Sequence, residues 1–264
     1  LIIIGFCFKI SAAPFHMWAP DVYEGAPTPI TAFFATAPKA AALLLFTRVM
    51  LGPFDPLVGQ WQQVIIFVSV ASMVVGALAA IMQTNIKRLL AYSSVGHAGF
   101  MLMGLAAANT DGAQALLVYL VLYIFMSAGA FGIVLLMRRS GHYIEDIREL
   151  AGLGQTQPGR AALLAIFMFS LAGIPPLAGF FGKLYVVLAA ISAHLTWLAV
   201  SGGGTSSGSG EDDIKVVKIM YFDEPHAPFD APSSRLLTLG IGIATPLLGA
   251  GLLVIAWTRK RRST

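Results

Sequence analysis

The chain has 264 residues, of which 57% are hydrophobic and only 11% are charged, and its formal net charge is +4. Soluble globular domains carry about 25% charged residues, so this composition indicates a membrane protein and excludes an ordinary soluble enzyme. The sequence contains no basic run with interleaved aromatic residues, which excludes a typical nucleic-acid partner. The single cysteine, Cys7, excludes an internal disulfide and a cysteine metal cluster.

Apolar runs of roughly 20 residues, the length that crosses a ~30 Å hydrocarbon layer, predict the membrane spans. We expect them over 1–18, 29–51, 64–82, 89–108, 113–137, 161–192 and 236–257. Pro14 interrupts the first span, and Gly173-Ile-Pro-Pro176 breaks the sixth. The chain begins without Met inside an apolar run, so we expect further helices upstream of it.

The sequence divides into three parts by composition. Residues 1–192 form a predicted transmembrane bundle, and residues 235–264 form a predicted final span with a basic tail. Between them, 193–234 contains a Gly/Ser run from Ser201 to Gly210 and then Glu211-Asp-Asp213. Gly/Ser runs are typical of flexible linkers, and three consecutive acids do not suit hydrocarbon. We therefore do not expect 193–222 to be a spanning helix.

The charged loops predict the orientation. The loops 19–28, 83–88 and 138–160 follow every second span and contain six Lys or Arg residues, namely Lys87, Arg88, Arg138, Arg139, Arg148 and Arg160. The opposite loops, 52–63 and 109–112, contain neither residue type. The positive-inside rule therefore places the first set of loops on the cytoplasmic side.

Three lysines within predicted spans, Lys9, Lys39 and Lys183, are the main candidates for function. A charged side chain at the bilayer centre costs at least ~2.5–3.5 kcal/mol on insertion scales, so buried lysines mark ion or proton pathways. For each lysine, the alternative is an ammonium that reaches the membrane surface from near a helix end. Two of the lysines lie near the proline breaks, and discontinuous helices also mark ion pathways, although a simple kink is the alternative.

His97, in the fourth predicted span, is the fourth candidate. Its small neighbours Gly96 and Gly99 favour close helix packing, and histidine titrates near neutral pH, so it could either shuttle protons or be a packed, hydrogen-bonded core residue. No predicted span contains Asp or Glu, so we expect any carboxylate partner of the lysines to come from elsewhere. The sequence also lacks nucleotide-binding loops and ligand sets for iron–sulfur clusters or haem.

Four stretches resemble the subunit N family of bacterial NADH–quinone oxidoreductase (complex I), one of the antiporter-like subunits. They are Phe8 to Pro29, which includes Pro-Asp-Val-Tyr-Glu-Gly-Ala-Pro over 20–27, Asn85 to His97, Ser170 to Lys183, and Val216 to Phe222. The resemblance covers nearly the whole chain and matches the C-terminal half of the family. It implies an all-α polytopic transmembrane bundle with discontinuous helices, a truncated form of the antiporter-like inverted-repeat fold.

The resemblance also implies a role for each candidate. Lys9 corresponds to the channel lysine of a broken helix, Lys39 to the connecting lysine of the next helix, and Lys183 to the lysine of the second broken helix. One departure stands out, because Ser201–Asp213 is Gly/Ser-rich and acidic where the family has an apolar helix. This segment resembles a substituted helix or an engineered scar.

The resemblance implies a proton-translocating, non-redox subunit that couples NADH oxidation and quinone reduction by the whole complex to proton transport. We expect Lys9, Lys39, Lys183 and His97 to form the relay and expect the chain itself to bind no cofactor or metal. Its expected partners are other membrane subunits of complex I and the lipid bilayer, with no nucleic acid, and its expected location is the bacterial inner membrane. The alternatives are a subunit of a multisubunit sodium/proton antiporter and a non-transporting membrane scaffold.

Overall fold

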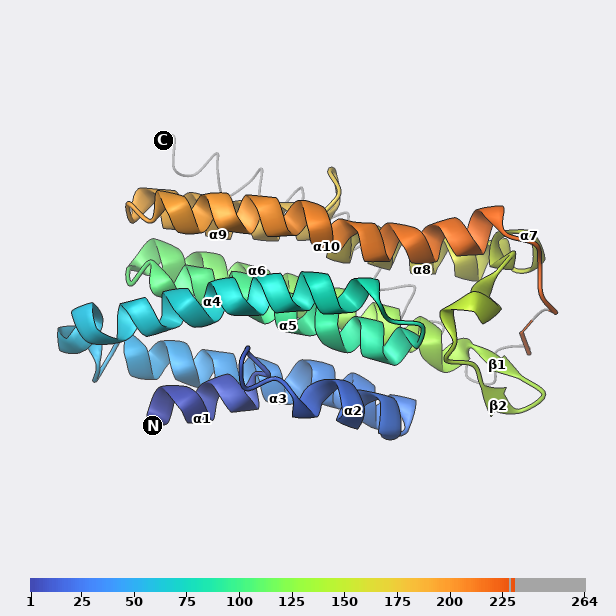
Figure 1. The fold of residues 1–264 in the computed structure, drawn as a ribbon, viewed down its shortest axis with the longest axis horizontal. Helices are drawn as coiled ribbons and strands as arrows, with labels where there is room; N and C mark the ends of the chain where they lie inside the picture. The colour runs from blue at the N-terminus through green and yellow to red at the C-terminus, as the bar shows by residue number, and fades with distance from the viewer. Residues whose placement is uncertain (228, 231–264) are drawn as a thin grey trace.

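The computed structural model describes residues 1–227, 229 and 230; the predicted last span, 236–257, and the basic tail lie outside them. Most of the described helices run along one common direction, and the β1–β2 hairpin and α7 lie together at one end of the bundle (Figure 1). We call this end the hairpin end. The predicted all-helical bundle is confirmed for the described residues, with one short two-stranded sheet beside the helices.

The first predicted span is broken. Helix α1 (Ile2–Lys9) ends before Pro14, and α2 (Trp18–Gly25) continues toward the hairpin end. Non-helical backbone in a bundle interior needs hydrogen-bond partners from neighbouring elements. Here the amide N–H of Ala13 donates to Ser72 Oγ at 2.8 Å, so a side chain of α4 supports the break.

Four long helices follow, and each confirms a predicted span to within a few residues at its ends, except for an earlier start to the third. They are α3 (Thr28–Met50), α4 (Val58–Ile81), preceded by the 3-10 turn η1 (Asp55–Leu57), α5 (Ile86–Ala106) and α6 (Thr110–Leu136). All four are long and apolar enough to cross a membrane, with η1 continuous with α4. Polar N-caps start two of them, because the side chains of Asn85 and Asn109 accept hydrogen bonds from first-turn amides of α5 and α6.

At their closest approach, helices α4 and α5 contact each other through the backbone of two glycines, with no side chain between them. A Cβ atom added to Gly76 would lie 2.7 Å from the Cα of Gly96 and 3.0 Å from the carbonyl oxygen of Tyr92. One turn away, Ser69 Oγ donates to the carbonyl of Gly99 at 2.7 Å across the same interface. Small residues at such a crossing let backbones approach closely, so the predicted packing role of the glycines around His97 is confirmed.

The sixth predicted span is also broken, as expected. Helix α8 (Pro158–Ala172) ends at Gly173, whose φ of +85° is the left-handed conformation that glycine adopts without strain, and α9 (Ala178–Ser192) resumes after the two prolines. The amide of Gly179 donates to Ser170 Oγ at 3.2 Å, so the two halves are joined by a side-chain hydrogen bond across the break.

The Gly/Ser run 201–210, interpreted from its composition as a flexible linker, is helical instead, whereas the expectation that 193–222 does not span the membrane stays a prediction. Residues Thr196–Phe222 form one continuous helix, α10, which runs back along the bundle to the hairpin end (Figure 1). From Gly210 onward its buried positions recur every three or four residues, as on one face of a helix, and the buried residues of α10 include Leu198, Ala199, Gly202, Gly210, Asp213, Val217 and Met220. Packing of this seam against α4 and α8 therefore outweighs the weak helix propensity of Gly and Ser.

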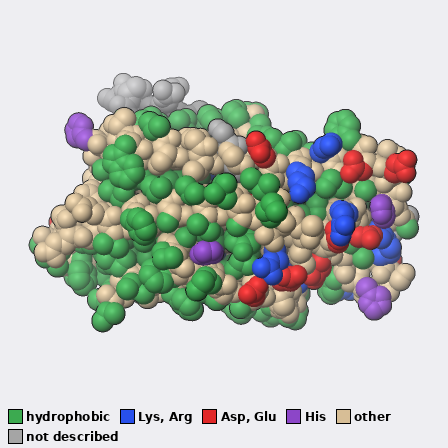
Figure 2. Space-filling model, in the orientation of Figure 1, with side chains coloured by type: hydrophobic (Ala, Val, Ile, Leu, Met, Phe, Trp, Pro, Cys, Tyr) green, Lys and Arg blue, Asp and Glu red, His purple; other side chains and the backbone are tan. Residues whose placement is uncertain are grey.

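The hairpin end contains the polar connection between α6 and α8. It comprises β1 (Arg138–Arg139) paired antiparallel with β2 (His142–Tyr143), the 3-10 turn η2 (Ile147–Leu150) and α7 (Leu153–Thr156). Apolar side chains cover most of the visible face of the bundle, whereas acidic and basic side chains gather toward this end (Figure 2). The charged loops thus lie together at one end, and their assignment to the cytoplasmic side stays a prediction.

Candidate functional site

Lys39 lies in the interior of α3 and is 2% exposed. Its ammonium Nζ donates to Ser94 Oγ of α5 at 2.6 Å and lies 5.5 Å from the ring centroid of Tyr23. Pro38 precedes it inside the helix and has no N–H, so the carbonyl of Phe34 lacks its usual helical donor. The buried location predicted for Lys39 is confirmed, and its ammonium is held by a hydroxyl and an aromatic face.

His97 lies between the two buried lysines. Its Nδ1 and Tyr119 Oη are 2.6 Å apart, and which of the two donates depends on the imidazole tautomer. The imidazole centroid is 5.3 Å from that of Tyr123, whose hydroxyl donates to the carbonyl of Ala35. Both Lys39 and Lys183 lie within electrostatic range of His97. The histidine is therefore a packed, hydrogen-bonded core residue that both buried lysines influence electrostatically.

Lys183 caps the second broken helix from inside the bundle. It is 6% exposed, and its ammonium donates to the carbonyl of Ala172, the last residue of α8, at 2.8 Å. A second hydrogen bond reaches Ser206 Oγ of α10 at 3.2 Å, and the ring centroid of Phe100 lies 5.2 Å away. Positive charge at a helix C-terminus is favourable, so the break provides Lys183 with a specific partner.

Lys9 does not join this group within the described residues. It is the last residue of α1, and its side chain is exposed, whereas the three other candidates are buried. The structure thus brings Lys39, His97 and Lys183 together and leaves Lys9 on the outer face of the first break. Its predicted role in the relay stays a prediction.

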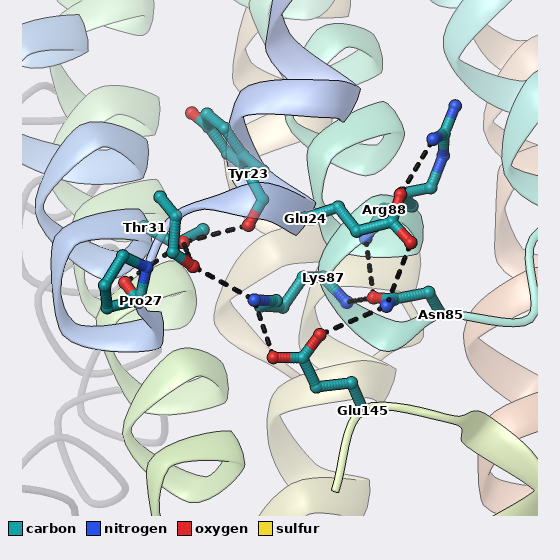
Figure 3. Close-up of polar contacts among 9 residues, drawn as sticks. Tyr23, Glu24, Pro27, Thr31, Asn85, Lys87, Arg88 and Glu145 are labelled. Carbon is teal, nitrogen blue, oxygen red and sulfur yellow. Dashed lines mark hydrogen bonds and ion pairs between the residues drawn. The ribbon is translucent and has the colours of Figure 1, made fainter. Parts of the chain in front are cut away.

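A charged cluster at the hairpin end was not predicted from the sequence. Lys87, 3% exposed, forms an ion pair with Glu145 at 2.6 Å and donates to the carbonyl of Ala26 at 3.0 Å (Figure 3). Beside it, Arg88 pairs with Glu24 of α2 at 2.7 Å, and Asn85 donates to both carboxylates. The cluster joins α2, the start of α5 and the polar connection, which are distant in sequence.

Further ion pairs and hydrogen bonds order the polar connection itself. The Arg148 guanidinium hydrogen-bonds to Asp146 and lowers the pKa of that carboxyl below its ordinary value. Arg139 pairs with Glu149, and the backbone amides of Ser140 and Gly141 donate to the carboxylate of Asp230. These amide donors, that of Gly141 first, lower the pKa of Asp230. The segment after α10 is thereby fixed against the β1–β2 hairpin.

Two buried carboxylates correct the expectation that no acid lies among the candidate lysines in this chain. Asp212 and Asp213 of α10 are each 3% exposed, and Asp213 is electrostatically coupled to Lys183. They were missed because the Gly/Ser-rich segment was interpreted as a linker. The signal that could have revealed them is the three-to-four-residue spacing from Leu198 through Asp213 to Met220.

Comparison with known proteins agrees with this geometry. Residues 1–207 match the family described as NADH:quinone oxidoreductase/Mrp antiporter, transmembrane. A subunit N of NADH-quinone oxidoreductase from Paramagnetospirillum magneticum is 53% identical over 97% of this chain and 52% of its own length. The subunit N from Rhodospirillum rubrum is 58% identical over 89% of this chain and 48% of its own length. The chain thus spans about half the length of these relatives, and the inferred resemblance to subunit N is confirmed.

The solved structures confirm the antiporter-like membrane fold. A chain of respiratory complex I from Thermus thermophilus is 34% identical, with a TM-score of 0.81 over 94% of this chain and 55% of that chain. A chain of the Mrp complex from Dietzia sp. DQ12-45-1b has a TM-score of 0.84 over 96% of this chain and 55% of that chain, but at 21% identity it shows the fold alone. With the four apolar helices, these matches make the chain a multi-pass protein of the bacterial inner membrane. The chain belongs to the NADH:quinone oxidoreductase/Mrp antiporter transmembrane family.

Proposed function

We propose that this chain is the proton-translocating C-terminal part of a subunit N of NADH–quinone oxidoreductase, and that it moves protons without taking part in electron transfer. The observation that carries the proposal is the buried row formed by Lys39, His97 and Lys183, in which each basic group has a hydrogen-bond partner. Similarity to the curated subunit N proteins supports the assignment to complex I rather than to a sodium/proton antiporter.

The row provides short steps for a proton. Lys39 donates to Ser94 Oγ, which itself lies beside the hydroxyl of Tyr123. The imidazole of His97 packs against Tyr123 and reaches Tyr119 by its Nδ1. Beyond His97, Lys183 holds the next exchangeable proton. Hydroxyl and imidazole groups both accept and donate protons, so they can relay a proton between two amines that have no direct contact.

Electrostatic repulsion between Lys39, His97 and Lys183 makes the protonation of each group depend on that of the others. A proton on His97 is repelled by protonated Lys39 and Lys183, so loss of a proton from one lysine favours its arrival on the histidine. In the proposed complex, quinone reduction elsewhere supplies the signal that changes the charge at one end. Quinone and NADH are used by the whole complex, and we place neither on this chain.

The first test is native-gel migration of the complete subunit, tagged and solubilised in mild detergent. We expect it to migrate with NADH dehydrogenase activity. Migration with sodium-dependent transport and without that activity would favour an antiporter instead.

The second test uses the assembled complex in vesicles and compares Lys39→Ala with Lys218→Ala, an exposed lysine on α10. We expect NADH-driven acidification to fall about tenfold or more in Lys39→Ala, a conservative figure beside the ~100-fold or larger contribution typical of a positioned proton-transfer group. Lys218→Ala is expected to retain normal pumping. Normal pumping in Lys39→Ala at normal NADH oxidation would contradict the proposal.

A further inference from the structure

A cavity opens beside Lys183 on the side facing α10 and the hairpin end. Its polar lining comes from Ser93 and His97 of α5, Lys183 of α9, and Thr205, Asp212 and Asp213 of α10. The cavity offers about 20 Å³ to the centres of water molecules, which is enough for roughly one water. It therefore joins the buried lysine to two acids that the relay of Lys39, His97 and Lys183 does not use.

The acids have unmet hydrogen-bonding capacity. Asp212 Oδ2 and Asp213 Oδ1 are both buried and have no hydrogen-bond partner among the described residues. An unpaired buried carboxylate oxygen is costly, and a proton or a bridging water removes that cost. Two carboxylates face one ammonium, so the fully ionised cavity carries one excess negative charge that a single proton neutralises.

The other elements around the cavity contribute no further charge to its lining. Helix α4 provides Met73, Gly76 and Ala80, and α8 provides Leu171. His97 is the titratable group on α5, and it faces Lys183. On α10 itself, Glu211 and Lys215 act on Asp212 from exposed positions. The charge inside the cavity is thus set by Lys183, His97 and the two aspartates.

The cavity also has a direction. Its lining runs from His97 to Leu89, eight residues or about 12 Å along α5, and Leu89 lies in the first turn of that helix. Ala80 lies in the last turn of α4 at the same end. The lining therefore extends from the depth of Lys183 toward the hairpin end, where the charged loops lie.

We propose that Asp212 and Asp213 form a proton-exchange site with Lys183, supplied by water from the hairpin end of the bundle. A proton that arrives as hydronium along that water first binds an Asp213 oxygen and leaves a neutral water behind. The protonated carboxyl then gives it through one bridging water to the neutral amine of Lys183. This transfer leaves an Asp213 carboxylate and a Lys183 ammonium, so atoms and charge balance. The inference deepens the proposed function, because it takes Lys183 as a member of the relay.

The test is an infrared titration of the complete subunit in lipid nanodiscs, which follows the carbonyl stretch of protonated carboxyl groups and needs no pumping. We expect a band from a buried carboxylic acid that Asp213→Asn removes and Asp213→Glu retains. Lys183→Gln is expected to move the midpoint of this band to higher pH, because the ammonium that favours the carboxylate is gone. Glu224→Gln, a change in an exposed acid outside the cavity, is the control and should leave the band unchanged.

Two results would overturn the inference. One is a spectrum that Asp213→Asn does not alter. The other is a midpoint that falls when Na⁺ replaces K⁺ in the buffer, which would identify a sodium site in place of a proton-exchange site. Both readouts are independent of the assembled complex, so failure here is distinguishable from failure of the proposed function. Normal pumping in Lys39→Ala with an intact Asp213 band would reject only the relay.

Discussion

The two broken helices share a sequence pattern but are stabilised in opposite ways. At the first break, between α1 and α2, Lys9 precedes the proline and is exposed, and the backbone is supported by the buried hydroxyl of Ser72 on α4. At the second, between α8 and α9, Lys183 follows the prolines and caps the broken end from inside. A lysine near a proline break therefore does not by itself define a buried site, because the packing around the break decides where the ammonium lies.

Removal of the internal cap should have the largest effect. Lys183→Ala takes away both the donor to the carbonyl of Ala172 and a member of the proposed relay. We expect NADH-driven proton pumping by the assembled complex to fall about tenfold or more, measured as acidification of vesicles at a fixed rate of NADH oxidation. Pumping at the normal ratio of protons to electrons would show that the second break needs no lysine for transport.

Disruption of the charged cluster around Lys87 should have the next largest effect. Glu145→Gln leaves the ammonium of Lys87 buried without its carboxylate partner, which costs about 3 kcal/mol in comparable buried pairs. We expect a lower thermal unfolding temperature in detergent and faster proteolysis near α2. Glu224→Gln, a change in an exposed acid outside the cluster, serves as the control. An unfolding temperature no lower than that of the control would mean that the cluster does not hold α2 against the start of α5 and the polar connection.

Loss of the hydrogen bond between Ser72 and Ala13 at the first break should have a smaller effect. Ser72→Ala leaves the buried amide of Ala13 without an acceptor, at a cost of about 1–3 kcal/mol. We expect faster hydrogen exchange at Ala13, measured by mass spectrometry on the subunit in nanodiscs. Ser72→Thr keeps the hydroxyl and should restore slow exchange. Equal exchange rates in all three proteins would exclude a role for α4 at this break.

The smallest expected effect concerns the hydrogen bonds of Asp230 at the hairpin end. The amides of Gly141 and Ser140 lower the pKa of Asp230, so their bonds stabilise the folded state above the ordinary aspartate value of about 4. That stabilisation is lost as the pH falls through the lower, folded-state pKa. We expect exchange protection of these two amides to decrease in that acidic range, and Asp230→Asn should make the protection independent of pH.

The sequence predicted most of the fold because hydrophobic run length and proline position act locally. The predicted span 29–51 is α3 within one residue at each end, and both proline breaks lie where Pro14 and Pro176 placed them. The linker prediction for the Gly/Ser part of α10 was wrong because composition indicates only the local helix propensity of the residues. The helix forms because its buried face packs against α4 and α8. The buried positions of Lys39 and Lys183 were predicted from where these residues lie within the apolar runs.

The polar partners could not be predicted in the same way. Ser94, Tyr119 and the carbonyl of Ala172 become partners of the candidate residues only when α5, α6 and α8 meet. The ion pair between Lys87 and Glu145 joins residues 58 positions apart. Asp213 and Lys183 interact in a similar way across two helices, α10 and α9, that fold back on each other. Long-range contacts of this kind leave no periodic signal in a single sequence.

The glycine contact between α4 and α5 has a mechanical consequence. With 2.7 Å between a hypothetical Gly76 Cβ and the Cα of Gly96, axial sliding of one helix past the other would drive neighbouring side chains into the crossing. We therefore expect the two helices to move as a fixed pair, with His97, one residue beyond Gly96, at a constant height in the bundle. We expect rearrangements in the proposed transport cycle to occur in the interrupted helices on either side.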